Sequence, residues 1–329
     1  MGGAQSTVRR VGRLAILALL GLAIAGELTA RFYLGLGDPP LFVSDPEIEY
    51  LNKPAMTYQR FGNRLVYNAY SMRCDDFPKH KSDPTQLRVL VLGDSVISGG
   101  SLTDQSQLAT ELLQARLLLE LNRSVVVGNI SAGSWGPGNL LAYVKRFGWF
   151  EADIVVIVLS SHDYADHPTF KPVVGRHPSM PDHTPFLALG EVFTRYSSRL
   201  RVWENPKRPQ APLSKPVSQE SIDDSTASLR ELIRLAKATG ANVLVAQHLE
   251  TSELSGSQTP GHEAIQRIAL EQGVQVVQLG PAMARCKAAG QNPYRDTIHP
   301  NAKGQEVIAT VLHDAILAGF STILDPRAR

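Results

Sequence analysis

The residues whose types and surroundings could do chemistry are a serine and a histidine far apart in the sequence, Ser95 and His299. His299 stands in the run Asp-Thr-Ile-His-Pro, with Asp296 three residues before it. A carboxylate at this spacing on one turn can accept the Nδ1 proton of the imidazole, which leaves Nε2 to take a proton from a hydroxyl group. Ser95 stands in the run Gly-Asp-Ser. These residues predict a serine nucleophile, its general base and the carboxylate that orients the base.

Each of the two motifs also has a structural interpretation. Ser95 could cap a helix, and His299 could cap one that begins at Pro300. The presence of both motifs in one chain favours catalysis by Ser95, Asp296 and His299.

The hydrophobic pattern predicts the elements that position these residues. Apolar strands are expected at 88–92, 124–130, 154–159, 242–247 and 274–279, and helices at 105–121, 139–147, 218–239, 261–272 and 302–317. Uninterrupted apolar strands that alternate with helices are typical of a parallel sheet covered on both faces. We therefore expect a three-layer α/β/α fold with a five-stranded parallel sheet. Ser95 directly follows the first strand, at the sheet edge where ligands bind in such folds.

From about residue 87 to residue 317 the sequence resembles the GDSL/SGNH hydrolase superfamily. The family's first block, GDS with a following glycine, stands at 93–99, and its last block, DxxHP, stands at 296–300. The resemblance implies a flavodoxin-like strand order, a triad of Ser95, Asp296 and His299, and no cofactor. It also implies an oxyanion hole that includes the backbone N–H groups of Ser95 and Gly133.

The third oxyanion donor is where the sequence departs from the family. An asparagine in a GxND block is expected after the third strand, but the chain has Ser-Ser-His-Asp, with His162 in that place. An imidazole can donate a hydrogen bond, so we predict that His162 replaces the asparagine. The alternatives are a structural histidine bonded to Asp163, or a site that passes the acyl group to a sugar hydroxyl instead of water.

Three aromatic residues close to these blocks are candidate substrate contacts. Aromatic faces beside a triad suit a carbohydrate or an acyl chain, although aromatic residues near strand ends also serve in packing. The candidates are Trp135, Tyr164 and Tyr294.

Composition excludes several other classes of function. Hydrophobic residues make up 43% of the 329 residues, charged residues 19%, and the net charge is +2, so nucleic acid is not an expected partner. Cys74 and Cys286 form no CxxC or Cys/His ligand set, so no metal is expected. In an exported domain the two cysteines could form a disulfide, or they could be two separate thiols.

The N-terminal segment predicts that the protein is targeted to a membrane. An apolar run over 14–36 is interrupted only near its end by Glu27 and Arg31, which are spaced to pair on one helix face. A helix of this length reaches about 35 Å, enough to cross a bilayer. Basic residues precede it at Arg9, Arg10 and Arg13. This flank predicts a single-pass anchor in the bacterial cytoplasmic membrane, with the N-terminus inside.

The alternative is a cleaved signal peptide, since residues 23–25 form an A-x-A-like site. Either interpretation places the catalytic domain on the periplasmic or extracellular side.

The expected organisation has three parts. Residues 1–37 form the anchor or signal segment, 38–86 an extension that packs on the main domain and includes a hairpin at 56–67, and 87–329 the hydrolase domain. A proline-rich insertion at 168–216 breaks the α/β pattern and is expected to form a lid or binding loop.

The predicted function is that of an extracytoplasmic serine esterase. Its expected substrates are O-acyl esters, above all O-acetyl esters, of cell-envelope or exported polysaccharide. A polysaccharide O-acetyltransferase with the same triad and a catalytically silent glycan-binding protein are the alternatives. The sequence predicts no particular protein partner.

Overall fold

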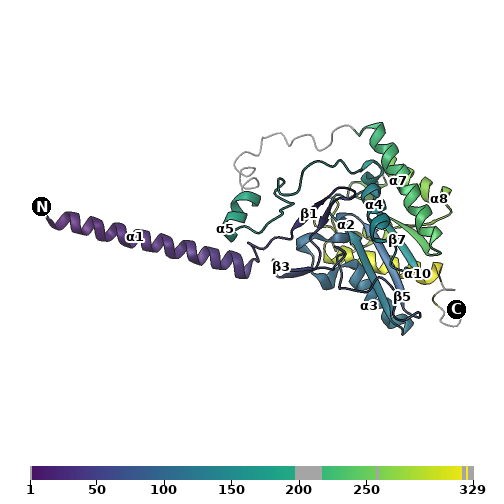
Figure 1. Ribbon diagram of the computed structural model, residues 1–329, viewed down its shortest axis with the longest axis horizontal. Helices are drawn as coiled ribbons and strands as arrows, with labels where there is room; N and C mark the ends of the chain where they lie inside the picture. The colour runs from purple at the N-terminus through teal and green to yellow at the C-terminus, as the bar shows by residue number, and fades with distance from the viewer. Residues whose placement is uncertain (1, 197–216, 257–258, 321–323, 325–329) are drawn as a thin grey trace.

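The computed structural model describes residues 2–196, 217–256, 259–320 and 324. Its centre is a parallel sheet of five strands (Figure 1). The strands are β5 (Leu87–Gly93), β6 (Val125–Ser131), β7 (Ile154–Ser160), β8 (Asn242–His248) and β9 (Gln275–Gln278). Their spatial order is β6-β5-β7-β8-β9, the flavodoxin-like order. The predicted fold class is confirmed.

Helices cover both faces of the sheet (Figure 1). One face carries α3 (Ala109–Leu121), α9 (Gly280–Ala288) and α10 (Ala302–Gly319). The other carries α4 (Pro137–Phe147), α7 (Gln219–Ala238) and α8 (Pro260–Glu271). Alternate residues of one strand face the two layers: Leu90 and Leu92 belong to the α4 and α7 core, and Val89 and Val91 to the α3 and α10 core.

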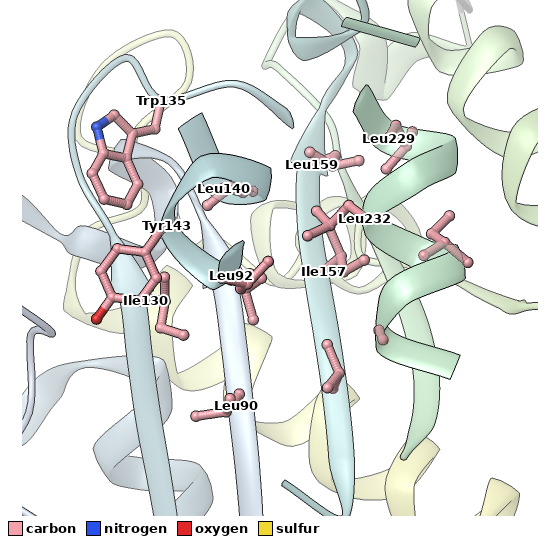
Figure 2. Packing of buried hydrophobic residues seen from close by; sticks show 14 of the residues in the cluster. Leu90, Leu92, Ile130, Trp135, Leu140, Tyr143, Ile157, Leu159, Leu229 and Leu232 are labelled. Carbon is pink, nitrogen blue, oxygen red and sulfur yellow. The ribbon is translucent and has the colours of Figure 1, made fainter. Parts of the chain in front are cut away.

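The core on the α4 and α7 face is shown in Figure 2, where Leu92 and Ile157 of the central strands meet side chains of both helices. Every residue of β5 and β7 is buried. Full burial of one such aliphatic side chain stabilises the fold by about 1.5 to 3 kcal/mol. The two strands that lead into the candidate site are therefore the most firmly held.

Short elements follow the carboxyl ends of the strands. They are α2 (Ser95–Ser98), η2 (Gly100–Leu102) and η3 (Gln105–Gln107) after β5, η4 (Ser161–Ala165) after β7, and η6 (Glu253–Ser255) after β8. The helix predicted at 105–121 begins later, at Ala109, because the side chain of Asp104 accepts from Ser106 N and closes a separate 3-10 turn. The predictions also missed α9.

The extension before the sheet forms two antiparallel hairpins. The first pairs β1 (Phe42–Asp45) with β2 (Glu49–Asn52), and the second pairs β3 (Met56–Arg60) with β4 (Asn63–Tyr67). The second is the predicted hairpin, which turns through Phe61 and Gly62, both with positive φ. Cys74 in this extension is buried, and both it and Cys286 are free thiols.

The N-terminal helix α1 (Gly2–Leu28) projects away from the body and continues into η1 (Thr29–Tyr33) (Figure 1). By length and composition, residues Arg9–Tyr33 could cross a membrane, and the apolar 18-residue window within them has a mean hydropathy of 1.9 and no residue buried against the rest of the chain. That exposure distinguishes it from the core helix of a soluble domain. It is a candidate membrane span or a signal sequence.

The described part of the proline-rich insertion runs along the first hairpin. Glu49 accepts from the backbone of Thr169 and Phe170, and Pro181 O accepts from Phe42 N. The segment then forms α5 (Ala188–Glu191) and η5 (Val192–Tyr196) against the base of α1. Residues 197–216, where the rest of the predicted lid or binding loop falls, lie outside the described residues.

Candidate active site

Ser95 lies at the tight turn between β5 and α2. Asp94 caps this short helix, because its Oδ1 accepts from Val96 N at 2.8 Å. The helix ends at Gly99, whose φ of 69° is left-handed and suits a glycine. The strand, cap and short helix together leave the Ser95 side chain half-buried at the carboxyl edge of the sheet.

Asp296, His299 and Ser95 form a continuous chain of contacts. His299 Nε2 lies 3.0 Å from Ser95 Oγ, and His299 Nδ1 lies 2.8 Å from Asp296 Oδ2. The backbone N–H of His299 also donates to Asp296 Oδ1, at 2.8 Å. This arrangement fixes the imidazole with a proton on Nδ1 and a free lone pair on Nε2 facing the serine hydroxyl.

The surroundings of Asp296 favour its ionised carboxylate. Partial burial raises its pKa, but the hydrogen bonds from the backbone of His299 and Ile298 and from the His299 ring outweigh this and lower the pKa below its ordinary value. Its side chain is 47% exposed, so solvent reaches the outer side of the pair.

A second histidine supports the turn that holds Asp296 and His299. His248, at the end of β8, is buried, and its Nε2 donates to Ile298 O at 2.8 Å. Burial lowers the pKa of His248 to about 4, so the ring stays neutral at physiological pH. His248 is therefore a positioning residue for the Asp296 to His299 turn.

Two backbone N–H groups are available for an oxyanion. Ser95 N and Gly133 N have no hydrogen-bond acceptor within the described part of the chain. Gly133 follows β6, and a Cβ built on it would meet nothing within 4 Å, so its surroundings are open. Tyr50 of the extension donates to Gly133 O at 2.6 Å and fixes the peptide that follows. The sequence offered no sign of this contribution.

His162 lies beside the nucleophile turn, but its ring is directed at carboxylates. Its Nε2 is 3.3 Å from Asp163 Oδ1 and 3.8 Å from Asp94 Oδ2, and its Nδ1 is 3.7 Å from Glu250 Oε1. None of these contacts is a hydrogen bond, so the structural role bonded to Asp163 stays a prediction. To donate to an oxyanion, the ring would have to turn away from Asp163, so that role stays a prediction.

The two carboxyl groups next to the His162 ring lie in surroundings that disfavour their ionised form. Asp94 Oδ2 and Asp163 Oδ1 are buried and have no hydrogen-bond partner. Burial raises the pKa of both side chains well above the ordinary value, and the charge of Asp163 raises that of Asp94 further. The nearby His162 acts in the opposite direction and lowers the pKa of Asp94.

The same three residues are those that could hold a metal ion. The ligand atoms of Asp94, His162 and Asp163 lie within 4.8 Å of one another. The hydrogen bonds that join Ser95, His299 and Asp296 involve none of these three residues. We therefore assign no metal to the reaction.

The predictions for two of the three aromatic residues are wrong. Trp135 is buried in the core beside Tyr143, and its Nε1 donates to Tyr50 O (Figure 2). Tyr294 is also buried, and its hydroxyl donates to Leu249 O. Both rings therefore pack and hold backbone instead of facing a substrate. Tyr164 is half-buried and lies against Gly261, so the structure leaves only its outer edge accessible.

One further residue of the extension supports the nucleophile. Arg73 is fully buried and donates to Ser98 O at 2.8 Å, Gly100 O at 3.0 Å and Thr103 O at 3.0 Å. Ser98 is the last residue of α2, and the other two carbonyl groups belong to the segment that follows it. Arg73 thereby keeps the end of α2 in place.

A serine, a histidine and an aspartate thus lie in hydrogen-bonded series at the carboxyl edge of a parallel sheet, the arrangement of a candidate serine hydrolase site. Residues 91–307 match the GDSL-like Lipase/Acylhydrolase family, and the chain belongs to this family of ester hydrolases. No curated protein matches the sequence.

Several solved structures resemble the chain at low identity. One is LAE5, an alpha/beta hydrolase enzyme from the metagenome of Lake Arreo, Spain, with 16% identity, a TM-score of 0.45, and coverage of 70% of this chain and 94% of that one. A lipolytic protein of the G-D-S-L family from Veillonella parvula has 13% identity, a TM-score of 0.44, and coverage of 71% and 98%. Axe2, an acetylxylan esterase from Geobacillus stearothermophilus, has 15% identity, a TM-score of 0.44, and coverage of 71% and 94%.

Proposed function

We propose that the protein is a membrane-anchored serine esterase that removes short acyl groups, acetyl above all, from cell-envelope or exported polysaccharide outside the cytoplasm. The single observation that carries the catalytic part is the 3.0 Å contact between His299 Nε2 and Ser95 Oγ, with Asp296 behind the imidazole.

The acylation step follows from that geometry. His299 Nε2 takes the proton as Ser95 Oγ attacks the ester carbonyl, and Asp296 stabilises the imidazolium that forms. The negative oxygen of the tetrahedral intermediate is held by the backbone N–H groups of Ser95 and Gly133. His299 then gives its proton to the sugar oxygen as the ester bond breaks, which leaves an acyl-enzyme on Ser95.

Deacylation repeats the steps with water as the nucleophile. His299 takes a proton from water, the hydroxide adds to the acyl carbonyl, and the serine oxygen leaves with the proton from His299. The exposure of Asp296 and the open surroundings of Gly133 support hydrolysis, since water has free access. Transfer to a sugar hydroxyl would need water to be kept out.

The openness of the site also supports the proposed substrate class. A half-buried serine beside an open loop suits a small acyl group carried on a large polymer that stays outside the enzyme. Envelope and exported polysaccharides are such polymers, and they lie on the side of the membrane to which residues 38–329 are assigned. In this proposal, residues 38–86 form an extension that completes the site, and residues 87–329 form the hydrolase domain.

The test compares the wild-type chain with Ser95→Ala on a short-chain aryl ester and on an acetylated polysaccharide. Acid release by the wild type and its loss in Ser95→Ala, with an unchanged circular dichroism spectrum, are expected. Ser134→Ala is the matched control, because Ser134 is an exposed serine on the oxyanion loop. Wild-type activity in Ser95→Ala would refute the triad. Acetyl transfer to an added sugar at the expense of free acetate would indicate the acetyltransferase instead.

The location is tested separately, with a phosphatase fused after Arg329. The fusion should be active in bacterial cells, because the basic residues before the apolar helix retain the N-terminus inside. An inactive phosphatase, together with an active cytoplasmic reporter at the same position, would reverse the assignment. N-terminal sequencing separates the anchor from a signal peptide, since a mature chain that starts at Gly26 would indicate cleavage.

A further inference from the structure

Large apolar side chains near the end of α1 are exposed on the surface. Phe186 is 94% exposed and Tyr33 is 80% exposed, and Phe32, Leu187 and Phe193 are also exposed. They come from two segments far apart in the sequence, η1 and the stretch that contains α5 and η5, which lie side by side in Figure 1. We call these five residues the apolar collar. Exposed apolar groups of this size mark an interaction surface.

The collar is attached to α1 through polar contacts. Glu27 Oε1 accepts from Ala188 N at 2.9 Å, and Oε2 accepts from Leu189 N at 3.0 Å. Arg31 pairs with Glu27 at 2.8 Å and donates to Phe186 O at 3.1 Å. Glu27 therefore satisfies two free N–H groups at the start of α5, and Arg31 donates to the carbonyl group just before that helix.

Apolar contacts continue up the same side of α1. A hollow of about 250 Å³ lies between Leu20, Ala23 and Ile24 of α1 and Leu187 and Leu189 beside them. These α1 residues belong to the stretch that could cross a membrane. The side chains of Leu187 and Leu189 are thus level with the last turns of that stretch.

The same segment is joined firmly to the catalytic body. Glu191 at the end of α5 pairs with Arg60 of β3 at 2.5 Å and accepts from Gly37 N at 2.7 Å, and both side chains are buried. The segment around α5 is therefore fixed at one end to α1 and at the other to the extension.

We propose that the apolar collar lies in the interface of the lipid bilayer and seats the catalytic domain on the membrane surface. The inference rests on the membrane anchor of the proposed function. About 20 apolar residues cross the hydrocarbon layer, so a helix that enters near Arg10 leaves it near Ala30, at the level of the collar. Aromatic rings are preferred at that depth, and the collar supplies four of them. Exposed apolar side chains extend along α1 as far as Leu28 and resume at Phe32 and Tyr33 of the collar, which favours lipid over a protein partner.

The experiment uses the full chain in phosphatidylcholine vesicles, with or without brominated acyl chains. An environment-sensitive fluorophore is attached to Phe193→Cys in a Cys286→Ser background, while the buried Cys74 stays unlabelled. Leu119→Cys is the matched control, because Leu119 on α3 is as exposed as the collar residues but far from α1 (Figure 1). Leu17→Cys, in the middle of the candidate span, is the reference. Hydrolysis of a soluble aryl ester reports that each labelled protein is folded.

The expected result is a blue-shifted emission at position 193 that brominated lipid quenches at least half as strongly as at position 17, with no quenching at position 119. A label at position 193 that behaves like the one at 119 would overturn the proposal. So would a label at 193 that is shielded from water but not quenched, since it would indicate a protein partner. If position 17 is also unquenched, the anchor itself fails, whereas the triad is judged separately by the Ser95→Ala assay.

Discussion

Two aspartate and histidine pairs flank Ser95, and they lie in opposite surroundings. In the pair of Asp296 and His299, the carboxylate is half exposed and receives hydrogen bonds from two backbone N–H groups and the ring. In the pair of Asp163 and His162, the carboxylate is fully buried, and the oxygen that faces the ring has no hydrogen-bond partner.

The difference shows that residue type alone does not decide what such a pair can do. Hydrogen bonds lower the pKa of Asp296 and make it a lasting anionic partner for its imidazole, whereas burial raises the pKa of Asp163. The first pair is suited to stabilise a charge that appears during the reaction. The second is suited to hold a ring in place.

The largest effect on kcat is expected when the carboxylate of the first pair, Asp296, is removed. Asp296→Asn should lower kcat about 10⁴-fold, because the amide favours the wrong tautomer of His299. The kcat for a short-chain aryl ester measures it, with Asp314→Asn, an exposed aspartate on α10, as the control. A loss below about tenfold would mean that the carboxylate does not orient the base.

A smaller effect is expected at the second pair. If His162 turns to donate to the oxyanion, His162→Ala should lower kcat about 10²-fold with KM little changed, and His162→Asn should retain or raise turnover. If the ring only balances Asp163, kcat for His162→Ala should stay within about twofold of the wild type. Parallel kcat and KM measurements on the two variants distinguish these outcomes.

The smallest effect concerns the pH dependence of stability. The raised pKa of Asp163 means that the folded chain holds its proton more tightly, so this stabilising contribution is present below about pH 4 and is lost as the pH rises toward the folded pKa. Asp163→Asn should therefore flatten the fall in unfolding free energy above about pH 4, as read from urea midpoints. Asp296→Asn should lower stability above about pH 4, and the difference from the wild type should disappear at lower pH, where the wild type loses this contribution. Equal pH profiles for wild type and Asp163→Asn would contradict the assignment.

The sequence was sufficient for the sheet and for the residues that meet at Ser95. Apolar strands such as 154–159 bury both faces, so their pattern is unambiguous, and DxxH is a local motif whose geometry follows from its spacing. The hairpin at 56–67 could also be predicted, because its strands alternate around a glycine turn.

What could not be predicted depends on contacts between distant parts of the chain. Nothing near Trp135 or Tyr294 indicates that their rings turn inward to hold Tyr50 O and Leu249 O. Likewise, His248 is separated by fifty residues from the carbonyl that it supports. For His162, the ring lies close to two buried carboxylates on the segments that follow β5 and β7, which only the assembled sheet brings together.

Hydrogen bonds from two residues of the extension bear on whether the hydrolase domain can be separated from it. Tyr50 and Arg73 both precede the hydrolase domain, yet one fixes the peptide after Gly133 and the other binds three carbonyl groups beside the nucleophile helix. A chain cut just before residue 87 would retain Ser95, Asp296 and His299 but lose these hydrogen bonds, each worth about 0.5 to 3 kcal/mol. The catalytic unit is thus larger than the part that matches the family, and insertion or transfer of the domain into another protein would have to carry residues 38–86 with it.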